Sequence, residues 1–329
     1  MKGGNGTRAI TTRKLSVGYV RGAIRNALLQ DLDLALIPGK LTCFMGPNGI
    51  GKSTLIRTLA GLQKPLSGEI RYDGIRLGDS VDLPQHLAVV LTDRISAINM
   101  TAFEVVAFGR YPYLRWDVKL SEKDKQIIAR TLSEFHIDHL RDKKIHELSD
   151  GQLQMVMIAR AVVQNTPSIL LDEPTAHLDL NNRLEIMNLL RNLAHQSDKA
   201  ILVSTHELDL ALQTADLIWL AGQDKRITIG IPEDLVLNGA FDSIFQFKGF
   251  DLKTGKVEHV PHRGIIIDLT GSGHEYLWTK NALERNGFVI GVDAPYRKVS
   301  VSQENSALLW TVDDQTRFNS LEELINYFA

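Results

Sequence analysis

Residues 46–53 read Gly-Pro-Asn-Gly-Ile-Gly-Lys-Ser, and this stretch decides the fold class. It matches the phosphate-loop pattern G-x-x-x-x-G-K-[ST] at every fixed position. An apolar run typical of a buried strand precedes it at 41–45, and a helix-like run follows at 54–62. A glycine-rich turn without a ligand would not need the lysine–serine pair. The context therefore predicts an α/β protein that binds a nucleoside triphosphate.

The loop residues divide the work of holding the phosphates. The spaced glycines let successive backbone N–H groups face phosphate oxygens, and the following helix adds the positive end of its dipole. We expect Lys52 to place a cation on the β- and γ-phosphates and Ser53 to offer a hydroxyl to Mg²⁺. The predicted nucleotide-binding residues here are Gly46, Pro47, Asn48, Gly49, Ile50, Gly51, Lys52, Ser53 and Thr54.

Two later apolar runs end in polar residues that suit this chemistry. The run at 168–172 ends in Asp172 and Glu173, which predicts a buried parallel strand that presents acids where such sheets bind ligands. We expect Asp172 to hold Mg²⁺ and Glu173 to polarise the attacking water. The run at 200–204 leads to His206, which we expect to hydrogen-bond the γ-phosphate rather than act as a structural residue. Glu173, His206 and Lys52 are the predicted catalytic residues.

Length and composition limit the remaining possibilities. The 329 residues allow one large and one small domain, and a net charge of -2 gives no general reason to bind nucleic acid. The single cysteine, Cys43, is expected to be a small buried hydrophobe. The N-terminus lacks the apolar stretch of a secretory signal, and no apolar run is long enough to span a bilayer. We expect a cytoplasmic protein whose membrane role, if any, comes through a partner.

Leu148-Ser-Asp-Gly-Gln152 begins a helix-like segment and lies between the phosphate loop and the acidic strand in the sequence. With the phosphate loop and the acidic strand, it makes residues 13–245 resemble the ATPase subunit of an ATP-binding cassette (ABC) transporter. That resemblance implies a P-loop NTPase with a RecA-like core, an antiparallel β subdomain and a helical signature subdomain at about 95–165.

The resemblance also implies a homodimer in the presence of ATP. Each signature would contact the nucleotide of the other copy through Ser149, Asp150, Gly151 and Gln152. Asp179 matches the inter-subunit loop, and Tyr19 matches the aromatic residue that stacks on adenine, unless it simply packs within its strand. Thr92 stands where the family has a glutamine that touches Mg²⁺ and senses the permease. Its hydroxyl would reach the ion only through water or a shifted loop, and the coupling contact must be made differently. Asp150 replaces the first signature glycine, and we expect it to cap its own helix.

Residues 103–113 and 204–213 are similar to the importers of iron–siderophore, haem or vitamin B12 complexes. In these importers the helical subdomain receives a coupling helix of the permease. Arginine and aromatic residues are enriched at interfaces, so Arg110, Tyr111, Tyr113 and Trp116 suit such a contact. The alternative is an aromatic cluster packed within the subdomain.

The expected domains are a tail at 1–12, the ABC ATPase domain at 13–250, a linker at 251–263 and a small α+β domain of unknown role at 264–329. In the small domain we expect strands at 264–269, 288–292, 298–301 and 307–312 and helices at 274–286 and 320–328. Ser320 and Glu323 predict a capping box. Gly271-Ser-Gly273 lacks the rest of a phosphate loop and favours a tight turn.

The sequence therefore predicts an ATP-binding and hydrolysing importer subunit that uses ATP and Mg²⁺. Its partners would be integral-membrane permease subunits and, indirectly, a substrate-binding protein, at the cytoplasmic face of the inner membrane. Two alternatives remain: a soluble non-transport ABC ATPase, and a nucleotide-sensing scaffold without turnover. Each motif occurs once and no sustained heptads separate Ser53 from Ser149, which disfavours the ribosomal and DNA-repair members.

Overall fold

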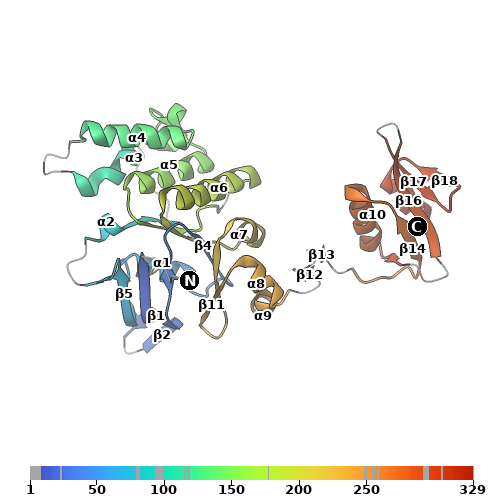
Figure 1. Ribbon diagram of the computed structural model, residues 1–329, viewed down its shortest axis with the longest axis horizontal. Helices are drawn as coiled ribbons and strands as arrows, with labels where there is room; N and C mark the ends of the chain where they lie inside the picture. The colour runs from blue at the N-terminus through green and yellow to red at the C-terminus, as the bar shows by residue number, and fades with distance from the viewer. Residues whose placement is uncertain are drawn as a thin grey trace, which may run out of the picture. The chain divides into compact units, whose positions relative to one another are not determined.

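A computed structural model describes residues 9–328 except 23, 79–81, 93–98, 115, 117–118, 177, 248–249, 254–255, 258, 292–295 and 305–306. The chain forms two compact units, Met1–Gln246 and Phe247–Ala329 (Figure 1). The expected start of the helical subdomain at residue 95 and the last residue of the strand expected at 288–292 lie outside the described residues.

The first unit is built on a six-stranded sheet in the order β11-β10-β4-β9-β8-β7. Its neighbours from β10 to β7 run parallel, and β11 is antiparallel at one edge. All residues of β4, β8 and β9 are buried, as expected for parallel strands with both faces covered. The strands are β4 (Leu41–Met45), β7 (Leu87–Val90), β8 (Ser168–Asp172), β9 (Ala200–Ser204), β10 (Leu217–Ala221) and β11 (Ile227–Gly230).

A second, antiparallel sheet has the order β2-β1-β5-β6, with β3 paired to β1. Its strands are β1 (Ile10–Arg21), β2 (Ile24–Leu32), β3 (Ala35–Leu36), β5 (Ser67–Tyr72) and β6 (Ile75–Arg76). The expected tail at 1–12 is wrong at its end, because β1 begins at Ile10, whose side chain is buried. Residues 10–12 already pair with β5 and belong to the domain.

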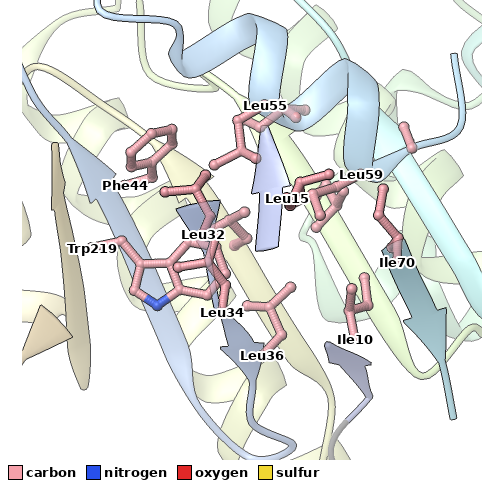
Figure 2. Packing of buried hydrophobic residues seen from close by; sticks show 14 of the residues in the cluster. Ile10, Leu15, Leu32, Leu34, Leu36, Phe44, Leu55, Leu59, Ile70 and Trp219 are labelled. Carbon is pink, nitrogen blue, oxygen red and sulfur yellow. The ribbon is translucent and has the colours of Figure 1, made fainter. Parts of the chain in front are cut away.

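One apolar cluster joins the two sheets to helix α1 (Lys52–Leu59), which follows the phosphate loop. Figure 2 shows Leu15 and Ile70 of the antiparallel sheet, Phe44 and Trp219 of the parallel sheet, and Leu55 of α1 in this cluster. Burying a large apolar side chain contributes about 1.5–3 kcal/mol, so the cluster fixes α1 firmly. The phosphate loop is thus held at both ends by the core.

The helical subdomain packs α3 and α4 against α5. Capping boxes start α3 at Thr101 and α4 at Ser121. Its helices are α3 (Ala102–Ala107), η1 (Phe108–Tyr113), α4 (Glu122–Glu134), η2 (Asp138–Leu140), η3 (Ile145–Glu147) and α5 (Asp150–Val163). The other helices of the unit are α2 (Leu83–His86), α6 (Leu180–Ser197), α7 (Leu208–Thr214), α8 (Pro232–Leu237) and α9 (Ala240–Phe245).

None of the helices in the described ranges has both the length and the apolar character that a bilayer span requires.

The second unit has its own sheet, in the order β15-β14-β16-β17-β18, and its own apolar core. Its elements are β14 (Ile266–Thr270), α10 (Gly273–Arg285), β15 (Val289–Ile290), β16 (Tyr296–Glu304), β17 (Ala307–Val312), β18 (Thr316–Phe318) and α11 (Leu321–Phe328). Strand β18 was not expected, and the expected linker at 251–263 overlaps an antiparallel pair of β12 (Phe250–Asp251) and β13 (Lys256–Val257). Ser320 accepts from the Glu323 N–H, but the Glu323 carboxylate accepts from Asn319, so the expected capping box is only half formed.

Because the second unit has a separate core, we expect a fragment of residues 259–329 to fold alone. Leu283 is fully buried in that core, so Leu283→Ala should destabilise the fragment by about 2–5 kcal/mol and abolish its cooperative unfolding. Circular dichroism during urea titration measures the free energy of unfolding and its cooperativity. Asn281→Ala, at an exposed position of the same helix, is the control and should leave the transition within about 0.5 kcal/mol. A fragment without a cooperative transition would contradict the separate core.

Candidate functional site

The phosphate loop connects β4 to α1 through backbone conformations that favour glycine. Gly46 and Gly51 have φ angles of 154° and 114°. A Cβ at Gly46 would lie 3.0 Å from the Ala221 carbonyl oxygen, and one at Gly51 would lie 3.0 Å from Leu28 Cβ. Both positions therefore require glycine for backbone conformation and for space.

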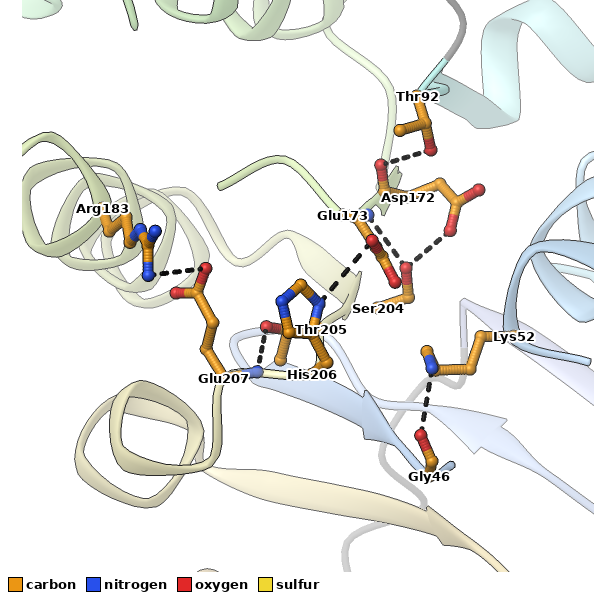
Figure 3. Close-up of polar contacts among 10 residues, drawn as sticks. All are labelled: Gly46, Lys52, Thr92, Asp172, Glu173, Arg183, Ser204, Thr205, His206 and Glu207. Carbon is orange, nitrogen blue, oxygen red and sulfur yellow. Dashed lines mark hydrogen bonds and ion pairs between the residues drawn. The ribbon is translucent and has the colours of Figure 1, made fainter. Parts of the chain in front are cut away.

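Lys52 lies buried at the start of α1, with its ammonium turned back over the loop. Its Nζ donates to the Gly46 carbonyl oxygen at 3.0 Å (Figure 3). Burial lowers the pKa of Lys52, while the carboxylates of Glu173 and Asp172 act in the opposite direction. A poorly solvated ammonium gains from an anionic partner such as a phosphate.

Of the two residues after Lys52, one is exposed to solvent and the other is packed in the interior. Ser53 is exposed, whereas Thr54 is buried and its Oγ1 lies 2.9 Å from the Tyr19 hydroxyl. Tyr19 itself is 50% exposed on β1. The hydrogen bond ties this half-exposed ring to the helix that follows the phosphate loop.

The acidic strand and its neighbour meet at their carboxyl ends through Ser204. Its Oγ donates to Asp172 Oδ1 at 2.6 Å and accepts from the Glu173 N–H at 2.9 Å (Figure 3). The Glu173 N–H also donates to the Ser204 carbonyl oxygen at 3.1 Å. These bonds hold Glu173 at a φ of 48°, a left-handed conformation that is unusual for glutamate.

Glu173 and His206 face each other from two strand ends. His206 Nδ1 lies 3.7 Å from Glu173 Oε2, and the imidazole side chain is 55% exposed. Thr92, which follows β7, donates its hydroxyl to the Asp172 carbonyl oxygen at 3.1 Å. The sheet order thus brings Lys52, Asp172, Glu173 and His206, predicted from distant parts of the sequence, to one edge.

The signature segment is capped differently from our expectation. Ser149, not Asp150, is the N-cap of α5: its Oγ accepts from the Gln152 N–H at 3.3 Å, and Gln152 Oε1 accepts from the Ser149 N–H at 3.2 Å. Asp150 is the exposed first residue of the helix, where its charge favours the helix dipole. Ser149 is the cap because its backbone is extended, whereas Asp150 is already the first helical residue.

Asp179 caps α6 through the Asn182 N–H at 2.9 Å, and Gly151 of the signature lies against Asn182. A Cβ at Gly151 would lie 3.1 Å from Asn182 Nδ2. The signature helix and the segment after the acidic strand are therefore in direct contact within one copy.

Arg110 does not belong to the exposed group in which we expected it. It is buried, its Nε donates to Asp124 Oδ1 and its guanidinium to the Val163 carbonyl oxygen, both at 2.8 Å. The exposed side chains nearby are Phe108, Tyr111, Tyr113 and Trp116, at 51, 57, 38 and 95%. We call these four residues the aromatic patch.

Ser204 is a site residue that was not predicted from the sequence. A hydroxyl at the end of an apolar strand could have indicated a site residue. The partners of Ser204, Asp172 and Glu173, belong to or follow a different strand. Only the pairing of Asp172 with Ser204 in the β8–β9 register reveals the contact.

Ser204→Ala removes a bond to a buried carboxylate and should lower the free energy of unfolding by about 1–3 kcal/mol. Ser168→Ala is the matched control, because the buried Ser168 Oγ at the other end of β8 has no partner among the described residues. Its change should stay within about 0.5 kcal/mol. Urea titration of both variants measures the difference, and equal destabilisation would contradict the role of Ser204.

Comparison with known proteins agrees with this geometry. Residues 29–176 match the ABC transporter family, and residues 263–329 match the iron ABC transporter C-terminal domain. An uncharacterized ABC transporter ATP-binding protein of Methanocaldococcus jannaschii is 36% identical over 76% of this chain and 89% of its own length. A petrobactin import ATP-binding protein of Bacillus anthracis is 34% identical over 73% and 88%. An iron(3+)-hydroxamate import ATP-binding protein of Bacillus subtilis is 33% identical over 72% and 88%.

The solved structures give the same fold. A dimeric structure of a bacterial ABC transporter cassette has a TM-score of 0.60 and 27% identity, and it covers 68% of this chain and 98% of the cassette. The expected fold class, the ATPase activity and the resemblance are thereby confirmed. The phosphate loop, the acid pair and these matches together mean that the chain belongs to the ATP-hydrolysing subunits of ABC transporters and carries the C-terminal domain of the iron transporter group.

Proposed function

We propose that this ATPase energises the import of an iron chelate, of the siderophore class, through a separate membrane permease. The match of residues 263–329 to the iron ABC transporter C-terminal domain carries the proposal. The names of the petrobactin and hydroxamate import relatives support the cargo class. Haem and cobalamin, which the sequence analysis also allowed, are the competing cargoes.

The proposed roles follow from where each side chain lies. Lys52 would neutralise the β- and γ-phosphates, and Glu173, fixed by Ser204, would polarise the attacking water. His206 would hydrogen-bond the γ-phosphate from the next strand end. Tyr19 would stack on adenine, since its exposed ring is tied to the helix that starts at Lys52. Catalysis of this kind is mostly positioning and charge neutralisation.

The oxygen donors near the loop fit a bound Mg²⁺. Ser53 offers an exposed hydroxyl and Asp172 a carboxylate, the hard oxygen ligands that Mg²⁺ prefers. When bound, the ion would neutralise phosphate charge. Thr92 donates its hydroxyl to the Asp172 carbonyl oxygen and would thereby support the acidic strand.

A second copy of the chain would complete each site. Ser149 and Asp150 are exposed, and the N-terminus of α5 (Asp150–Val163), with the Gly151 N–H group, would offer an anion site. Asp179 would lie between the copies. The dimeric cassette structure supports this arrangement.

The aromatic patch would receive the permease. Arg110 lies 4.2 Å from the centre of the Tyr113 ring, and it is bonded to Asp124 and to the α5 backbone. Exposed aromatic side chains on a rigid base are typical of interface anchors. Peripheral association with the cytoplasmic face of the membrane would follow from this contact.

Glu173→Gln tests the proposed function when the chain is reconstituted with its permease in vesicles. Loss of the general base should lower ATP turnover and uptake of ferric siderophore at least about 100-fold, while ATP binding and the ATP-bound dimer persist. Haem and cobalamin uptake are measured in parallel. Turnover without uptake of any of the three would favour the soluble ATPase, and nucleotide binding without turnover would favour the sensor.

Trp116→Ala combined with Tyr111→Ala tests the aromatic patch. We expect loss of stimulation by the permease, by about tenfold or more, with unchanged turnover of the chain alone, because interface aromatics carry much of the binding energy. Leu237→Ala, which removes another exposed apolar side chain of the same unit, is the control. Unchanged stimulation in the double variant would contradict the assignment.

A further inference from the structure

An ion pair between a buried carboxylate and a partly exposed guanidinium lies next to the predicted catalytic histidine. Arg183 of α6 and Glu207, which follows His206, are joined by an Arg183 Nη1–Glu207 Oε1 contact of 3.4 Å (Figure 3). The Glu207 side chain is only 7% exposed, and that of Arg183 is 35% exposed. Nothing in the proposed chemistry accounts for a charge pair at this place.

The arginine end of the pair is fixed to the segment before Asp179. Arg183 Nε donates to the Leu178 carbonyl oxygen, and the Arg183 N–H donates to the Asp179 carbonyl oxygen at 3.0 Å. Asp179 in turn caps the same helix. The guanidinium therefore moves with the two residues that lead into α6.

The glutamate end is fixed to the histidine. Glu207 is the next residue after His206, and its N–H donates to Thr205 Oγ1 at 3.0 Å. Burial raises the pKa of Glu207, and Arg183 is the largest opposing influence, ahead of a hydroxyl of Thr175 and the charge of His206. Glu207 Oε2 is buried without a hydrogen-bond partner among the described residues. A buried carboxylate is costly to leave unpaired, so the contact between Glu207 and Arg183 resists separation.

We propose that Arg183 and Glu207 are positioning residues that couple His206 to the Leu178–Asp179 segment. The proposal rests on the proposed roles of His206 at the γ-phosphate and Asp179 at the second copy. A shift of His206 on nucleotide binding moves Glu207, and Arg183 carries that movement to the Leu178 carbonyl. Nucleotide binding at one site thereby shifts the Leu178–Asp179 segment, which would contact the other copy.

The test measures steady-state ATP turnover by the purified full chain, with Arg183→Met, Glu207→Leu and the double variant. Replacing both charges by apolar groups of similar size keeps a buried pair packed, so the double variant should unfold near the wild-type midpoint. Its kcat should nevertheless fall about tenfold, with KM for ATP changed less than about twofold, because the pair does not touch the nucleotide site. A double variant with wild-type kcat would overturn the proposal.

A second measurement separates positioning from general damage. If the pair acts through His206, adding the double variant to His206→Ala should lower single-turnover hydrolysis by less than about twofold further. Independent, multiplicative losses would overturn the proposal. Because the chain alone is assayed, neither outcome depends on the cargo or the permease.

Lys199→Met is the control. Lys199 is a buried cation whose Nζ donates to the Thr166 carbonyl oxygen at 2.7 Å, and it lies just before β9, at the end of that strand opposite to His206. We expect lower stability and unchanged kcat per folded molecule. An equal loss of kcat in this control would assign the effect of Arg183 to stability and contradict positioning.

Discussion

The site depends on one hydrogen-bonded junction, Ser204 between Asp172 and Glu173 at the ends of β8 and β9. Parallel strands that are adjacent in a sheet end at the same edge, so a single hydroxyl reaches both acids. The bonds fix the acid that would hold Mg²⁺ and force the next residue into a left-handed turn. The Glu173 carboxylate lies 3.7 Å from His206 Nδ1.

The apolar cluster around α1 extends this constraint to the phosphate loop. Phe44 and Leu202 from the parallel sheet and Leu15 from the antiparallel sheet hold the helix from both sides. Burial also leaves Lys52 poorly solvated, which lowers its pKa and strengthens its attraction to an anion. Fold stability and nucleotide binding therefore draw on the same packing. The ion pair of Arg183 and Glu207 connects this edge of the sheet to the Leu178–Asp179 segment.

Much of this arrangement follows from local sequence. The phosphate loop, the acid pair and the histidine are each set by a few adjacent residues, and the apolar runs at 41–45, 168–172 and 200–204 coincide with the strands β4, β8 and β9. The sequence does not reveal contacts between distant residues: Ser204 with Asp172, or Arg110 with Asp124. It also misplaced the cap of α5, because Ser149 and Asp150 are both favourable N-cap residues and only the backbone decides. The short strand β18 carries too few residues for a periodic signal.

The most direct test of the account asks whether one copy completes the site of another. Lys52→Ala disables the phosphate loop and Ser149→Arg disables the signature, so each variant alone should hydrolyse no ATP. Mixed dimers contain one site that joins an intact loop to an intact signature, and the account predicts that mixing restores turnover. If the mixture remains as inactive as its components, the proposed composite site is wrong.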